Sequence, residues 1–82
     1  MLVVLDTNVL ISALLRPVSQ PAIIVKKWEE RKFTLLTSET QIEELTRVTR
    51  YQKIKERINV SSTGRLINEV KNLAVMVDHP PL

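Results

Sequence analysis

A short apolar run with an acidic residue at its end opens the chain. Leu2 to Leu5 are four consecutive apolar residues, and Asp6 follows them directly. Such a run predicts a strand buried on both faces, as in a parallel sheet. A carboxylate at the carboxyl end of that strand points into the crevice where open α/β sheets bind ligands. Chemistry alone favours a plainer role for Asp6 or Asn8, as the N-cap of a helix that follows.

The rest of the sequence alternates predicted helices with predicted strands. Ser38 and Gln41 have the spacing of a capping box at the start of one helix. The alternation predicts an α/β fold with a parallel sheet of two to three strands and about five helices packed around it. We expect helices at about residues 7–15, 21–31, 38–48, 51–57 and 62–74, and strands at about 2–5, 33–37 and 75–77, the last of which also fits the spacing of the fifth helix.

Residue counts exclude several kinds of site. The chain contains no cysteine, one histidine (His79) and one glycine (Gly64), which excludes disulfides, a histidine metal cluster and a glycine-rich phosphate loop. Three aromatic residues argue against a stacking surface for single-stranded bases. Twelve basic and nine acidic residues give a net charge of +3, which permits a polyanionic partner without requiring one. No stretch has the length of a membrane span, so we expect a soluble cytoplasmic protein with no membrane partner.

A second acidic position follows from helical spacing. Apolar residues recur every three positions and centre a buried stripe on Leu45. At about 100° per residue, Glu43 lies opposite this stripe and faces water, whereas Glu44 lies at its edge. Asp6 and Glu44 are therefore candidates for two carboxylates that meet at a crevice, although most helix glutamates are ordinary surface charges. Oxygen ligands of this kind suit Mg²⁺ or Mn²⁺, which activates water and neutralises phosphodiester charge.

The segment from Val3 to Leu15, with Asp6-Thr-Asn8 at its centre, resembles the opening of PIN-domain proteins. The resemblance is to the prokaryotic group described as toxin components of toxin–antitoxin pairs. It covers essentially the whole chain, in order and with matching spacing. It continues through Pro21-Ala22, Trp28, Phe33-Thr-Leu-Leu-Thr-Ser38, Ile42-Glu-Glu44-Leu45 and Tyr51-Gln-Lys53-Ile54.

The resemblance implies an α/β sandwich around a parallel sheet and a metal-dependent endoribonuclease that acts on RNA. It implies a Mg²⁺ or Mn²⁺ cofactor and a cognate antitoxin as a possible partner. Asp6 matches the first acidic metal ligand of the family, and Glu44 matches the second. Asn8 matches the small polar residue that supports the catalytic site by hydrogen bonding.

The family's remaining acidic residues follow the next strand, in an aspartate-rich segment. This sequence stops at Leu82, before that point, and Asp78 matches no catalytic position. We therefore expect residues 1–82 to form a single incomplete PIN-like domain without the last strands. Such a site holds Mg²⁺ weakly, so we expect an impaired or inactive nuclease. The alternative is a non-catalytic oligomeric or partner-binding remnant of a PIN domain.

The first strand and a group of basic residues each suggest a partner. Without its second neighbouring strand, the run from Leu2 to Leu5 becomes an exposed apolar edge, which predicts a homo-oligomer. Arg47, Arg50 and Lys53 are candidates for phosphate contacts with RNA, or for contacts with an acidic antitoxin segment. A solvated helical face accounts for them slightly better. Trp28 is expected in the core.

Overall fold

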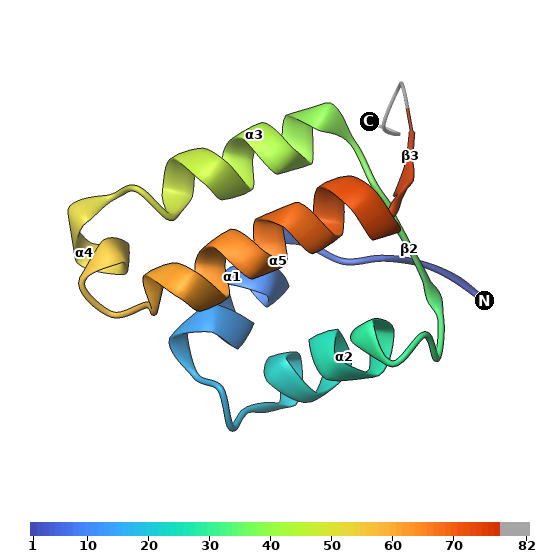
Figure 1. Cartoon of the computed structure of the whole chain (residues 1–82), viewed down its shortest axis with the longest axis horizontal. Helices are drawn as coiled ribbons and strands as arrows, with labels where there is room; N and C mark the ends of the chain where they lie inside the picture. Colours follow the sequence, from blue (N-terminus) through green and yellow to red (C-terminus); the bar gives the residue numbers. More distant parts are fainter. Residues whose placement is uncertain (78–82) are drawn as a thin grey trace.

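The structure, a computed structural model, describes residues 1–77 and consists of helices packed beside a small sheet (Figure 1). The elements are β1 (Leu2–Val4), α1 (Thr7–Leu15), α2 (Gln20–Glu29), β2 (Thr34–Thr37), α3 (Glu39–Val48), α4 (Gln52–Lys55), α5 (Val60–Leu73) and β3 (Val75–Met76). These elements confirm the predicted α/β class. Within residues 1–77 no single helix is long and apolar enough to cross a membrane; α1 and α2 meet that test only when taken together, across a bend of 104°.

The three strands are parallel and lie in the order β1-β2-β3, with Val3 beside Leu35. Each crossover moves one step in the same direction, and right-handed crossovers of this kind place their helices on one face of the sheet. Val3 and Leu35 accordingly pack toward the helical core. Leu2 and Val4, which alternate with Val3, are 66% and 70% exposed.

The prediction of a first strand buried on both faces is therefore wrong. β1 lies at the edge of the sheet, and only one of its faces meets the helices. The expectation of an exposed apolar edge from Leu2 to Leu5 agrees with the structure at Leu2 and Val4, whereas Leu5 belongs to the core and Val3 packs against it. Whether this edge joins a second chain stays a prediction.

One core ties the helices to the sheet. Its most completely buried side chains are Leu10 of α1, Leu35 of β2, Leu45 of α3 and Val70 of α5. Trp28 of α2 is also buried, as predicted. Because each of these elements contributes to the same cluster, α1 and α3 are held against the strand ends that they follow.

Side-chain caps explain where the longer helices begin. Asp6, Ser19, Ser38 and Asn59 each accept a hydrogen bond from a backbone N–H in the first turn of the next helix. Such a bond satisfies one of the N–H groups that a helix N-terminus leaves without a partner. The caps at Ser19 and Asn59 make α2 and α5 begin slightly earlier than predicted. α2 ends at Glu29, ahead of the left-handed Arg31 (φ 64°), a conformation typical of a helix end.

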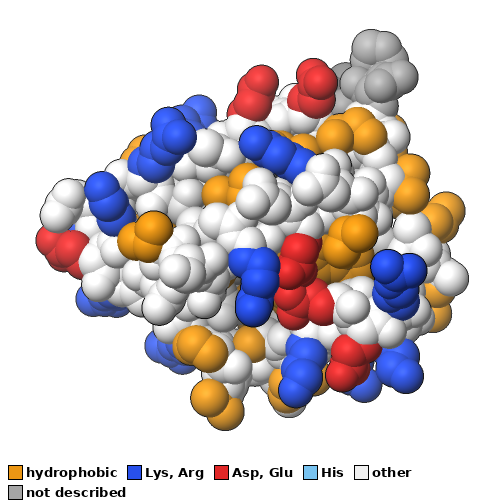
Figure 2. Space-filling model, in the orientation of Figure 1, with side chains coloured by type: hydrophobic (Ala, Val, Ile, Leu, Met, Phe, Trp, Pro, Cys, Tyr) orange, Lys and Arg blue, Asp and Glu red, His pale blue; other side chains and the backbone are white. Residues whose placement is uncertain are grey.

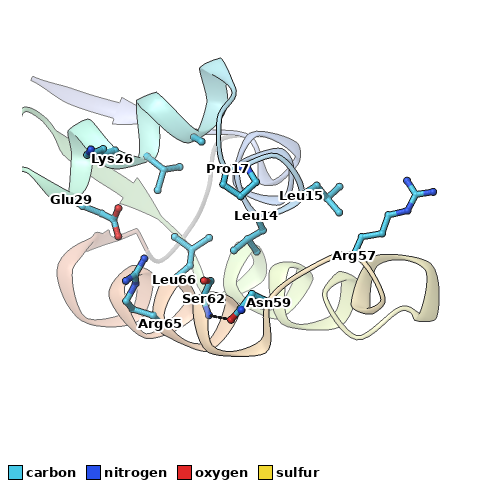
Figure 3. A pocket seen from close by; sticks show the side chains of 13 residues that line it. Leu14, Leu15, Pro17, Lys26, Glu29, Arg57, Asn59, Ser62, Arg65 and Leu66 are labelled. Carbon is cyan, nitrogen blue, oxygen red and sulfur yellow. Dashed lines mark hydrogen bonds between the residues drawn. The ribbon is translucent and has the colours of Figure 1, made fainter.

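A cavity of about 370 Å³ lies between α1, α2 and the start of α5 (Figure 3). Leu14 and Leu66 form part of its apolar wall. Lys26, Glu29 and Arg65 lie together at one end of this cavity, from α2 and α5 (Figure 3). This end of the cavity is therefore a charged contact between two helices that belong to different crossovers.

Glu69 of α5 belongs to the same contact. Its side chain is 21% exposed, and its Oε2 atom is buried without a hydrogen-bond partner. Burial, followed by the hydrogen bond and the charge of Glu29, raises the pKa of Glu69 from 4.5 to about 7, whereas Arg65 lowers it. Arg65 Nε lies 3.5 Å from Glu69 Oε1. A proton on one of the two carboxyls removes the repulsion between the negative charges of Glu29 and Glu69.

This contact makes the free energy of unfolding depend on pH. The pKa of Glu69 is about 7 in the folded chain against an ordinary 4.5, so the folded state binds more protons between these values. Stability therefore falls as the pH rises from about 4.5 to about 7, and the loss is complete above 7. We expect Glu69→Gln to raise the melting temperature at about pH 8, where the wild-type carboxyl is ionised beside Glu29, and to change it little at about pH 5.

Thermal melts followed by circular dichroism at about pH 5 and about pH 8 measure this effect. Glu30→Gln is the matched control, because Glu30 is exposed at the end of α2. An unchanged melting temperature of Glu69→Gln at the higher pH, or an equal rise in Glu30→Gln, would contradict the assignment.

Candidate active site

Asp6 and Glu44 line one cleft of about 500 Å³ at the carboxyl ends of β1 and β2. Residues 4–7 form one wall of the cleft, and residues 36–38 form another. The first turns of α3 contribute Thr40, Gln41 and Glu44, and Val77 closes the cleft beyond β3. Two carboxylates that are far apart in the sequence therefore face the same space.

The helical spacing predicted which glutamate of α3 lies on this side. Glu44 is half-buried and lines the cleft with Asp6. Glu43 is exposed and lines a different depression, beside α5. The preference for Glu44 over Glu43 as the partner of Asp6 therefore agrees with the geometry, while the role of Glu44 as a ligand stays a prediction.

Asp6 is both a helix cap and a residue of the cleft. Its Oδ1 atom accepts a hydrogen bond of 3.0 Å from the backbone N–H of Asn8, and its carbonyl accepts one of 2.9 Å from the N–H of Val9. The two interpretations of Asp6 that the sequence left open are thus compatible. The cap fixes the direction of the carboxylate with one oxygen and leaves the other oxygen for a ligand.

Gln41 joins the two sides of the cleft. Its Nε2 atom donates a hydrogen bond of 2.5 Å to the carbonyl of Leu5, the residue before Asp6. Its Oε1 atom accepts a hydrogen bond of 2.5 Å from Oγ1 of Thr37, at the end of β2. Glu44 comes one helical turn after Gln41. The amide of Gln41 therefore fixes the position of Glu44 relative to the strand that ends at Asp6.

This role of Gln41 was not predicted from the sequence. The expected capping box is half present, because Ser38 Oγ accepts a hydrogen bond of 3.1 Å from the N–H of Gln41. The reciprocal bond from the Gln41 side chain is absent among the described residues, since that side chain bonds to Thr37 and Leu5 instead. Thr37 and Ser38 are adjacent polar residues at the end of a predicted strand, and this was the sequence signal for a hydrogen-bond network here. The structure shows that both residues are buried, and buried polar groups are hydrogen-bonded.

The predicted supporting role of Asn8 has a different basis from the one expected. Asn8 is exposed, and its side chain neither lines the cleft nor makes a hydrogen bond within residues 1–77. Its backbone N–H is the group that supports Asp6. The support therefore depends on the start of α1 rather than on the amide side chain.

The three basic residues predicted to contact RNA are not gathered at the cleft. Arg47 and Arg50 line a separate depression of about 500 Å³, together with Tyr51 and Lys71. Lys53 is exposed on α4 and does not line this depression. Figure 2 shows Lys and Arg side chains over α3 and α4 on this face of the molecule.

The donor set of the cleft suits a hard divalent cation. Asp6 and Glu44 offer carboxylate oxygens, which Mg²⁺ and Mn²⁺ prefer, with water completing the coordination. Residues 1–77 contain no group of three or more acidic, histidine or cysteine side chains placed to hold a metal. Among the described residues, Asp6 and Glu44 are the carboxylates that line the cleft. Asp78 and His79 lie outside the described residues.

A sequence model of the PIN domain family matches residues 2–81. The chain belongs to the PIN domain family. PIN domains are nucleases that generally act on RNA and use divalent metal ions. No curated protein and no solved structure gives a significant match. In this PIN domain, Asp6 lies at the end of β1 and shares its cleft with Glu44.

We expect Gln41→Leu to lower the free energy of unfolding by about 1–2 kcal/mol. The substitution removes two side-chain hydrogen bonds and leaves the carbonyl of Leu5 without its donor. Urea unfolding monitored by Trp28 fluorescence measures the change. Gln52→Leu is the control, because it removes only an exposed hydrogen bond to Glu56; an equal loss in both variants would show that the bridge to Leu5 and Thr37 is unimportant.

Proposed function

We propose that this PIN domain is a Mg²⁺- or Mn²⁺-dependent endoribonuclease whose catalytic cation is held by Asp6 and Glu44. The observation that carries the proposal is the shared cleft at the carboxyl ends of β1 and β2, which Asp6 and Glu44 both line. Ligand sites in open α/β sheets lie at this end of the strands. Membership of the PIN family supports nuclease chemistry on RNA at this place.

The protein supplies position and environment. Asn8 N–H holds one oxygen of Asp6, and Gln41 fixes the α3 turn that carries Glu44. Val4 and Leu36 contribute apolar wall to the cleft. A bound cation supplies neutralisation of phosphodiester charge and activation of water. The role of the protein is to hold the carboxylates of Asp6 and Glu44 in position before the cation binds, so that binding of the cation requires little rearrangement.

The same proposal extends to a toxin of a toxin–antitoxin pair that acts in the cytoplasm and binds a cognate antitoxin. The support is the resemblance of the segment around Asp6 and Asn8 to that group. The non-catalytic alternative is not favoured, because Asp6 and Glu44 line a common cleft and the chain matches a nuclease family over residues 2–81.

Removal of either carboxylate is expected to lower cation-dependent RNA cleavage by roughly 100-fold or more. Asp6→Asn keeps a good helix cap, and Glu44→Gln keeps the size of the side chain, so both variants test charge rather than folding. The measurement is cleavage of a fluorescent RNA in Mg²⁺, in Mn²⁺ and in excess chelator. Glu43→Gln is the control, since Glu43 neighbours Glu44 but lies outside the cleft. Equal activity of Glu44→Gln and Glu43→Gln, or cleavage that persists in chelator, would refute the metal site.

A homo-oligomer formed through the β1 edge is part of the proposal. The support is the exposure of Leu2 and Val4 on a strand with one free edge, since such edges pair with other chains. We expect Leu2→Lys to convert the oligomer to a monomer without loss of helix content. Light scattering after size-exclusion chromatography measures the mass, and Val18→Lys in the exposed turn before α2 is the control. A wild-type monomer at high concentration would exclude the oligomer.

A further inference from the structure

We propose that Arg47, Arg50, Lys71 and Tyr51 form a holding site for single-stranded RNA in the depression between α3 and α5. The proposal rests on the proposed ribonuclease function and adds to it the form of the substrate and a second contact surface. Lys71 and Tyr51 are new members of this surface. Lys53, predicted beside Arg47 and Arg50, does not line it.

The depression concentrates positive charge. Arg47 lies in the last turn of α3, Arg50 lies in the turn that follows this helix, and Lys71 comes from α5. The ion pair found among residues 1–77 joins Arg65 to Glu69, so these three cations are not neutralised by a described carboxylate within salt-bridge distance. Glu43 is the acidic residue of the lining. A surplus of cations along a depression attracts a flexible polyanion.

Tyr51 adds an aromatic face to these charges. It is 52% exposed, and it precedes α4 without making a side-chain cap for that helix. Its half-exposed side chain lines the depression together with the cations. Unpaired bases stack on exposed aromatic side chains, and this contact tolerates any base. This proposal departs at Tyr51 from the expectation, drawn from composition, that the chain has no stacking surface.

Charge and aromatic character together favour RNA over an acidic protein segment. An acidic peptide uses the cations alone, whereas a single strand uses phosphates and bases. The position on α3 also favours RNA. Glu44 and Arg47 are three residues apart, which is about 4.5 Å along a helix axis and about 60° around it. A strand held at Arg47 therefore lies beside the helix that presents Glu44 to the cleft.

Fluorescence anisotropy with a labelled single-stranded RNA of about twelve nucleotides, in excess chelator, tests the proposal. The chelator removes divalent cations, so binding is measured without cleavage. We expect Lys71→Gln to weaken binding by about fivefold and to reduce the slope of log affinity against log salt by about 0.7. Tyr51→Ala is expected to weaken binding by about tenfold with an unchanged salt slope, while Tyr51→Phe keeps the affinity.

Lys27→Gln is the matched control, because Lys27 is exposed on α2 and does not line the depression. Equal effects of Lys71→Gln and Lys27→Gln would overturn the site, and so would an unaltered affinity of Tyr51→Ala. Competition by poly-glutamate as effective as that of unlabelled RNA would overturn RNA as the occupant in favour of an acidic protein.

The outcomes separate this site from the metal site. If the anisotropy results hold while Asp6→Asn and Glu44→Gln leave cleavage intact, the proposed catalytic function fails and the RNA site stands. If cleavage needs both carboxylates while Lys71→Gln and Tyr51→Ala bind as the wild type does, the RNA site fails and the catalytic function stands.

Discussion

The amide of Gln41 is the interaction on which the arrangement of the cleft depends. It donates to the carbonyl of Leu5 and accepts from the hydroxyl of Thr37, so one side chain joins β1, β2 and α3. A partly buried backbone carbonyl that loses its donor destabilises the fold. A side chain at this position must therefore both donate to Leu5 and accept from Thr37. The position of Glu44 relative to Asp6 thus depends on the neutral amide of Gln41, one turn before Glu44 in α3.

The order of the strands determines the rest of the architecture. The crossovers move in one direction along the sheet, and with the usual right-handed connection this puts the helices on a single face. The core therefore forms between the helices and one side of the sheet, where Leu35 is buried. The same order leaves Leu2 and Val4 outside it. The position of β1 at one end of the sheet leaves its outer edge open. Its carboxyl end lies beside that of β2 and forms part of the cleft.

Local features of this fold were predictable, and long-range ones were not. The apolar run before Asp6 located β1, and the three-residue recurrence around Leu45 placed Glu44 on the side of the cleft. The burial of β1 was misjudged, because burial depends on which strands become neighbours. Gln41 was assigned a local bond, since the carbonyl of Leu5, 36 residues away, is brought near only by folding. Lys71 joins Arg47 for the same reason, through the packing of α5 on α3.

Asp6 ends a strand, caps a helix and faces the cleft. A substitution at such a position affects both the stability of α1 and the chemistry of the site, so selection acts on both effects. Asparagine satisfies the first requirement and fails the second, whereas most other residues fail both. A lineage that loses the activity while retaining the fold would therefore be expected to change Glu44 freely and to replace Asp6 with another capping residue. The pattern of replacements at these two positions would record which of the two requirements had been relaxed.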